Sequence, residues 1–546
     1  MAFLLLWIES LAAMLLFVAM IMSLRRRQIK RWKLVALSVS SALPIFALAV
    51  GVCVGATFLS SVVQVLSKVW CLYVYLWTVA FAAGVAIIVT RGARPTGNDP
   101  SFVACGWPRV RLAMAFSAAL ALLAITFWDT DSAARAQLTS LRTEASTLAL
   151  SVAPSRVPDR ENAAIFYAKA SETMMTQEDM PKEWQHKQSK WLHFKSDMID
   201  KDLRDYLARH HATLYYLRKA TSLPSCYFER NYGQPSFEIP FPELARIRHS
   251  ARLLAMAARV RAADGDVKGA IEDVAAIFNL SAHINQNPML IAHLVAMAIY
   301  QIGKGTLDGV LNATNPTAND LAILKLDDKR SFRHILQRTL ICEEACGLST
   351  FAILATQNQN ANKYLLWQYS ISCEPPLLLS LWRVFMMSDD LAVYRQMINK
   401  IQNLNSYSYY EVKSEWSALN TDTENKHGGI MTAQIAPTLL RCSISMNRAD
   451  TSHRLMCVAV AASLYRLKVK KYPERLEDLV PDYIPVIPLS PFDGQPLKMM
   501  ADGKGIILYG ADSDNQSPQK KPFTDDDSWR IFRLGVAAPK DVKADF

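Results

Sequence analysis

The sequence predicts a mainly α-helical protein with three parts: a four-helix transmembrane anchor, an α-helical extracytoplasmic domain with helical hairpins, and a small α+β C-terminal module. Three observations predict this class. Long uninterrupted apolar runs are concentrated in residues 1–128 of the 546. Across most of residues 159–448, apolar side chains recur every three or four positions, which is the helical period. Residues 449–546 carry turn signals and short strand-like runs, including those of a β-hairpin.

The predicted anchor consists of four apolar stretches, 2–24, 34–59, 69–90 and 112–128. The first three exceed the roughly 18 residues needed to cross a bilayer, and the fourth is at that limit. Each must be helical, because lipid offers no hydrogen-bond partners to the backbone. Buried core helices are the alternative, but four such runs in succession favour a membrane. The basic segment RRRQIKRWK follows the first run rather than preceding it, unlike in a signal peptide.

The orientation follows from the basic residues in the connecting loops. Loop 25–33 has six Lys and Arg and loop 91–111 has four, whereas loop 60–68 has one. Basic loops stay in the cytoplasm. We therefore expect a multi-pass protein of the bacterial cytoplasmic (inner) membrane, with everything after Trp128 in the periplasm. Transport through the four helices is a weaker alternative, because the apolar stretches carry few charges.

The net charge of +11 does not predict nucleic-acid binding. Residues 1–128 hold eleven basic and two acidic residues, which leaves 49 basic and 47 acidic residues in 129–546. A soluble part that is nearly neutral lacks the basic surface that phosphate backbones need.

The soluble part divides into three segments. Residues 129–158 predict a helical linker that ends in the proline-containing SVAPSRVPDR, and 159–448 predict the α-helical extracytoplasmic domain. Within that domain, apolar residues recur at helical spacing on both sides of the turn ADGD at 263–266, which predicts an antiparallel helical hairpin. This hairpin resembles a single tetratricopeptide-type repeat, although no second copy follows at a 34-residue period.

The C-terminal module, 449–546, is predicted to begin with a helix over about 451–469. Turns and short strands follow, and Asp502-Gly503 between 498–500 and 505–509 predicts a β-hairpin.

The last seventy or so residues of this module resemble the C-terminal half of the major pseudopilin of type II secretion systems. The matching features are Tyr472-Pro473 followed by LEDLV, the turn Pro491 to Gly494, LYGADSD, and an acidic stretch that ends in Trp529. The ENAAIFY segment and the ADGD hairpin extend a second resemblance, to uncharacterised envelope membrane proteins of planctomycete-type bacteria. A pilus subunit is not expected, because the module follows over 300 extracytoplasmic residues.

The pseudopilin resemblance implies a calcium site. By this resemblance, the carboxylate ligands would be Asp512, Asp514 and one of Asp525, Asp526 or Asp527. Of the last three, Asp525 and Asp527 are the candidate ligands. Calcium prefers six to eight oxygens from such a loop. A solvated acidic turn remains the alternative, because Lys520 and Lys521 lie inside the loop and the spacing is not that of an EF-hand.

No motif predicts a catalytic activity. The sequence has no G-x-S-x-G elbow, Walker loop, H-E-x-x-H or dinucleotide fingerprint. Adjacent His210 and His211 point in different directions on a helix and do not suit one metal. Cys342 and Cys346 lie four apart on an expected helix, without the second pair that a zinc site needs, so buried free thiols are expected there.

The leading interpretation is therefore a membrane-tethered scaffold or interaction protein of the bacterial cell envelope. Its predicted partners are the lipid bilayer and envelope proteins, with no nucleic acid. The alternative is an envelope hydrolase whose site is assembled from scattered residues, with His249, His283 or His427 as the base.

Overall fold

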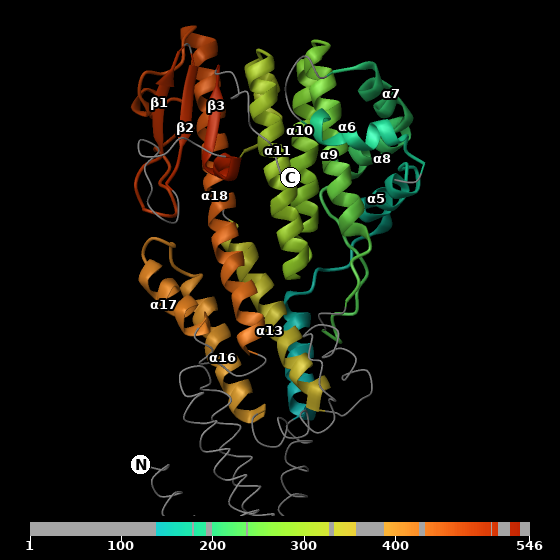
Figure 1. The fold of residues 1–546 in the computed structure, drawn as a ribbon, viewed down its shortest axis with the longest axis vertical. Helices are drawn as coiled ribbons and strands as arrows, with labels where there is room; N and C mark the ends of the chain where they lie inside the picture. The colour runs from blue at the N-terminus through green and yellow to red at the C-terminus, as the bar shows by residue number, and fades with distance from the viewer. Residues whose placement is uncertain are drawn as a thin grey trace, which may run out of the picture. The chain divides into compact units, whose positions relative to one another are not determined.

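The computed structural model describes residues 138–176, 179–192, 199–235, 239–326, 332–355, 387–424, 432–503, 505–511 and 525–535. The chain divides into two compact units, Met1–Thr78 and Val79–Phe546, and every described residue belongs to the second. The predicted anchor, 1–128, lies outside the described residues. What they show is a mainly helical fold with one small antiparallel sheet, as the sequence predicts (Figure 1).

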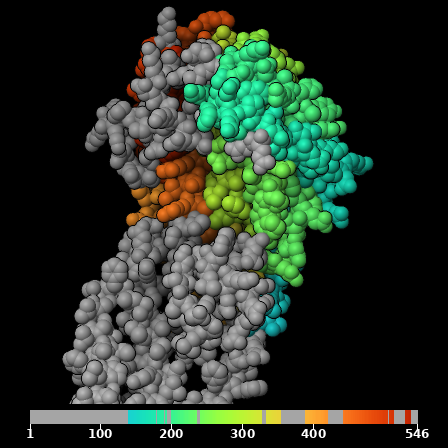
Figure 2. Space-filling view, turned by 45° about the vertical axis from the view of Figure 1, so that its right-hand side comes forward, coloured from blue at the N-terminus to red at the C-terminus, as the bar shows by residue number. Residues whose placement is uncertain are grey.

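The first described segment is helical over 138–152 and falls within the predicted linker. It buries Leu141, Ala145 and Ala149 and is therefore packed against the rest of the unit. Four short helices follow a 3-10 turn, η3 (Asp159–Glu161). They are α5 (Ala163–Glu172), α6 (Lys182–Trp191), α7 (Lys201–Arg209) and α8 (His211–Thr221). Figure 2 shows these helices, in blue-green, lying beside the green helices that follow them.

The predicted hairpin is confirmed as α9 (Glu243–Ala263) and α10 (Val267–Ile284). Gly265 in the turn has a φ of +84°, a left-handed conformation that glycine adopts without strain, so α9 can end there. The Asp266 carboxylate then accepts from the Gly269 N–H and begins α10. Turn chemistry and apolar period therefore act together to specify this hairpin.

The third long helix, α11 (Leu290–Ala313), packs against both members of the hairpin. A Cβ atom at Gly303 would lie 2.6 Å from the Phe278 ring, so α10 and α11 approach closely where only glycine fits. Among the described residues, α11 is the one helix long and apolar enough to cross a membrane. Of its most apolar stretch, 67% is buried within the protein, which is typical of a core helix.

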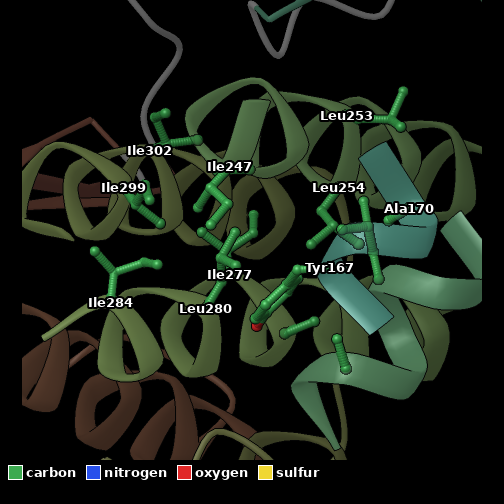
Figure 3. Close-up of a cluster of buried hydrophobic side chains, with 14 of the residues drawn as sticks. Tyr167, Ala170, Ile247, Leu253, Leu254, Ile277, Leu280, Ile284, Ile299 and Ile302 are labelled. Carbon is green, nitrogen blue, oxygen red and sulfur yellow. The ribbon is translucent and has the colours of Figure 1, made fainter. Parts of the chain in front are cut away.

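The main core lies among these helices. Side chains from α9, α10 and α11, including Ile247, Ile277 and Ile299, form one cluster with Tyr167 from α5 (Figure 3). Ile277, Ile299 and Leu254 are fully buried, and each buried side chain of this size contributes about 1.5–3 kcal/mol. The short helices are thus joined to the hairpin by one apolar cluster.

The later helices are α12 (Ala318–Ala322), α13 (Arg333–Ala355), α16 (Met387–Leu404), α17 (Lys413–Glu424) and α18 (Thr432–Val469). At 38 residues, α18 is longer than the predicted helix over about 451–469. It packs against α11, α13, α16 and α17 as well as the sheet. The boundary expected at 448 therefore falls inside a helix that both parts share.

The C-terminal module contains η5 (Leu476–Leu479), η6 (Asp525–Arg530) and a three-stranded antiparallel sheet in the order β1-β2-β3. The predicted hairpin is confirmed as β1 (Lys498–Asp502) and β2 (Gly505–Tyr509), and β3 (Ile531–Leu534) completes the sheet. β3 packs against α11 and α18, whereas β1 lies at the opposite edge and is largely exposed. The sheet is thus attached to the helices through β3 and, against α18, through β2.

Candidate functional site

The predicted calcium ligands lie mostly outside the described residues. Asp512 and Asp514 are outside them altogether. Asp525 and Asp527 are in η6, whose backbone is described but whose side chains at these positions are not. Within the described part of the chain, no group of three or more His, Cys, Asp or Glu side chains is arranged to hold a metal ion. Calcium binding by the loop that contains Asp512 and Asp514 therefore stays a prediction from the pseudopilin resemblance.

His283 is held by hydrogen bonds on both ring nitrogens. Its Nε2–H donates to the Leu223 carbonyl at 2.9 Å, and its Nδ1 accepts from the Tyr167 hydroxyl at 2.8 Å. Burial lowers the pKa of this imidazole, so it is neutral at pH 7. The two ring nitrogens therefore join α10 to α5 and to the segment that follows α8, and both are occupied by hydrogen bonds within the fold.

His249 contacts a second polar cluster on α6, α7 and α9. Its Nε2 lies 3.1 Å from the Tyr206 hydroxyl, which also accepts from Gln188. Burial, together with nearby His210 and Arg252, lowers the pKa of His249 to about 4. His210 donates from Nδ1 to the Tyr206 carbonyl. These contacts fix the aromatic cluster of Trp184, Trp191 and Tyr206.

The third histidine of the hydrolase interpretation, His427, lies outside the described residues.

A further buried histidine, His293, lies at the start of α11 and donates from Nδ1 to the Asn285 side chain at 2.9 Å. Burial lowers the pKa of His293 to about 4. The structure therefore places His249 and His283 in separate hydrogen-bonded clusters on different helices, where each ring bonds to a tyrosine.

The most developed polar arrangement in the described residues is the contact between the helices and the C-terminal module. We call it the docking seam. It consists of Gln301, Lys304 and Asn312 on α11, Ser452 on α18, and the backbone of 528–535.

Lys304 is the centre of the docking seam. It is 4% exposed, and its ammonium group donates to the Ser528 and Ile531 carbonyls. These carbonyls lie at the end of η6 and the start of β3, where a helix end presents unpaired acceptors. The same ammonium group lies 5.4 Å from the centre of the Phe532 ring. Burial lowers the pKa of Lys304 to about 8. The lysine thus joins the middle of α11 to the sheet.

Two further sets of hydrogen bonds extend the docking seam in both directions. Asn312, two turns beyond Lys304, donates to the Arg533 carbonyl at 2.8 Å and accepts from the Gly535 N–H at 2.7 Å. Ser452 donates to the Trp529 carbonyl at 2.6 Å and also bonds to Gln301. These contacts join two helices, α11 and α18, to the backbone of 528–535 and so fix the position of that segment against the helices.

Aromatic packing completes this contact. The Trp529 ring lies between Phe492, at 5.3 Å between ring centres, and the Arg448 guanidinium, at 5.1 Å. Tyr409 packs on the other side of Phe492. Trp529, one of the residues that carry the pseudopilin resemblance, is therefore part of the structural contact between sheet and helices.

Comparison with models of protein families, with curated proteins and with solved structures gives no match for this chain.

The seam residues are absent from the sequence-based candidates. The available signal was the interruption of the apolar run in α11 by Gln301, Lys304 and Asn312. A lysine among apolar residues is rarely buried unless it is paired. Its partners are backbone carbonyls more than 220 positions away, and no local pattern identifies them.

Proposed function

We propose that this protein is a membrane-tethered scaffold of the bacterial cell envelope that holds its C-terminal module in a fixed position for a partner protein. The docking seam carries the proposal. A surface that is presented to a partner is useful only if its position is defined, and the docking seam defines the position of 528–535. The attachment uses buried hydrogen bonds as well as packing, which specify one arrangement.

The tether is the four-helix anchor predicted over 1–128. It is proposed for the cytoplasmic (inner) membrane, with the large C-terminal part in the periplasm, from the distribution of basic loop residues. The resemblance to planctomycete-type envelope proteins supports the same location. Alkaline carbonate extraction tests the tether, because a peripheral protein would be released. Protease added to spheroplasts tests the orientation, since a periplasmic domain would be digested.

The proposed presentation surface is the exposed edge strand β1 together with the loop that precedes it. Val486, Leu489 and Met500 are large apolar side chains that are 67%, 44% and 42% exposed. Large exposed apolar side chains on a small module are the residues on which we base a proposed protein contact. An envelope protein partner is therefore proposed to contact β1 and the preceding loop.

Site-specific photo-crosslinking tests this function in intact cells. A photo-reactive amino acid is placed at Met500, and a matched probe is placed at Tyr215 on α8, which is 55% exposed. We expect one discrete envelope protein to be crosslinked from position 500 and not from 215. The same products from both positions, or none from 500, would count against a scaffold that acts through this surface.

A further inference from the structure

The sheet of the C-terminal module has an open edge along β1. Among the described strands, β1 pairs with β2 alone. On its other side, Leu489 forms an antiparallel bridge with Pro496 just before β1 begins, and the Leu497 N–H donates to the Pro488 carbonyl at 2.9 Å. No described residue continues this pairing along 498–502. Pro488 and Leu489 thus take up the start of a fourth strand position, and the described chain leaves the rest of it open.

The backbone of β1 presents hydrogen-bonding groups at this edge. Asp502 and Gly505 flank a two-residue turn, so they form a hydrogen-bonded pair of the hairpin. Such pairs alternate along an antiparallel ladder, and the N–H and C=O groups of every second residue back from Asp502 therefore point towards β2. The same groups of Met499 and Ala501 point to the open side, as the Leu497 N–H does. An added antiparallel strand can form about four hydrogen bonds with them.

The side chains of β1 give the open edge a direction. Lys498, Met500 and Asp502 alternate with Met499 and Ala501, so the first three lie on one face of the sheet, and all three are exposed. Opposite charges therefore stand at the two ends of this face, with an apolar side chain between them. Residues directly opposite each other in an antiparallel pair interact, and like charges there are destabilising. A strand that fits has a basic, an apolar and an acidic residue at alternate positions, in that order from its N-terminus.

We propose that the partner protein adds an extended segment of this pattern to the sheet as a fourth strand, antiparallel to β1. In recognition by strand addition, backbone hydrogen bonds give affinity and alternate side chains give specificity. The proposal rests on the scaffold function proposed above and names what the partner presents. Leu489, which is 44% exposed, lies beside Pro496 at the end where the added strand finishes, and it offers that strand an apolar contact.

The test uses the purified full-length protein in detergent and two fluorescent peptides of identical composition. One contains the segment Lys-Val-Leu-Thr-Glu, and the other contains Glu-Val-Leu-Thr-Lys. Fluorescence anisotropy should show saturable binding of the first peptide and about tenfold weaker binding of the second, whose charges face like charges. Lys498→Glu combined with Asp502→Lys should invert this preference. Both positions are exposed, and a misfolded variant cannot produce an inverted preference.

Methyl groups on the peptide backbone test the hydrogen bonds. The valine and threonine of the first peptide lie opposite Ala501 and Met499, so N-methylation of both removes donors that point at β1 and should abolish binding. N-methylation of the leucine is the matched control. Its N–H points away from β1, and the affinity should change little.

Four results would each overturn strand addition: no saturable binding, equal binding of the two peptides, a preference that the double variant does not invert, or equal effects of the two methylations. A chain that is dimeric in detergent, and whose dimer the first peptide dissociates, would place a second copy at this edge and would overturn it too. Photo-crosslinking from Met500 separates this result from the scaffold function. A discrete envelope protein crosslinked there, without peptide binding, removes the strand and leaves the scaffold.

Discussion

In the α9–α10 hairpin, two helices are joined by a short turn and packed through apolar side chains at regular spacing. In the docking seam, the contacting residues are 77 to 227 positions apart, and most of their contacts are hydrogen bonds between a side chain and the backbone. The hairpin places its one buried carboxylate, Asp273, against Arg218 at 2.7 Å. The docking seam buries Lys304, whose hydrogen bonds in the described residues go to backbone carbonyls and not to a carboxylate. Apolar packing thus defines the local unit, and buried polar contacts define how distant parts fit together.

The largest effect is expected in the hairpin. Ile277→Ala removes three carbons from a fully buried position and should lower the free energy of unfolding by about 4 kcal/mol. Urea unfolding of the detergent-solubilised chain, followed by tryptophan fluorescence, measures it. Ile291→Ala is the control, because Ile291 is 48% exposed, and it should change stability little. Similar losses from both would mean that α10 is not in the core.

The docking seam is tested by Lys304→Met, which keeps the length of the side chain and removes its donor. Two buried carbonyls then lose their partner, and we expect a loss of about 3 kcal/mol in the free energy of unfolding. Lys268→Met, at an exposed position on α10, is the matched control. If Lys304→Met is as stable as the unmodified chain, apolar packing alone holds the module.

Glu343 should make the stability of the helical region depend on pH. Burial raises its pKa from an ordinary 4.5 to about 7, so the folded chain holds a proton there that the unfolded chain releases. The free energy of unfolding from this group is therefore highest below pH 4.5 and falls as pH rises to 7, by up to about 3 kcal/mol. Glu343→Gln can still accept from Leu290 but cannot ionise. The difference between the two proteins, measured by urea unfolding at several pH values, should vanish at the acidic end; a constant difference would refute this.

The smallest effect is expected at the surface. Arg204 and Asp264 form a two-bond ion pair, but their side chains are 47% and 46% exposed. Arg204→Ala should lower the free energy of unfolding by about 0.5 kcal/mol, since water and salt screen such pairs. Repeating the measurement in high salt should remove the difference. If Arg204→Ala lowered the free energy of unfolding as much as Lys304→Met, solvent exposure would not explain the difference between the surface ion pair and the buried seam contacts.

The sequence predicted the elements whose cause is local. The hairpin followed from apolar spacing on both sides of ADGD, and the β1–β2 hairpin followed from Asp502-Gly503. Both depend on residues within a few turns of one another. The mainly helical class was predicted for the same reason.

What the sequence did not predict depends on distant contacts. The segment 129–158 was expected to be a helical linker, and it is helical over 138–152. Its contacts were not predicted, because Glu144 bonds to Arg395 and the Val152 carbonyl accepts from Arg338, both far along the chain. The N-terminal half of α18 mixes polar and apolar residues without a clear stripe, because it contacts helices on several sides. Cys342 and Cys346 were noticed as a spaced pair, whereas the contact between Cys342 and Met289 arises only through the fold.

The length of α18 has a mechanical consequence. Thirty-eight residues at 1.5 Å each make a rod about 57 Å long. A tilt of about 10° at one end moves the other end by roughly 10 Å. Because α16 and α17 pack against α18, and Arg448 and Ser452 near its middle contact Trp529, a tilt of this helix would move the strands with it.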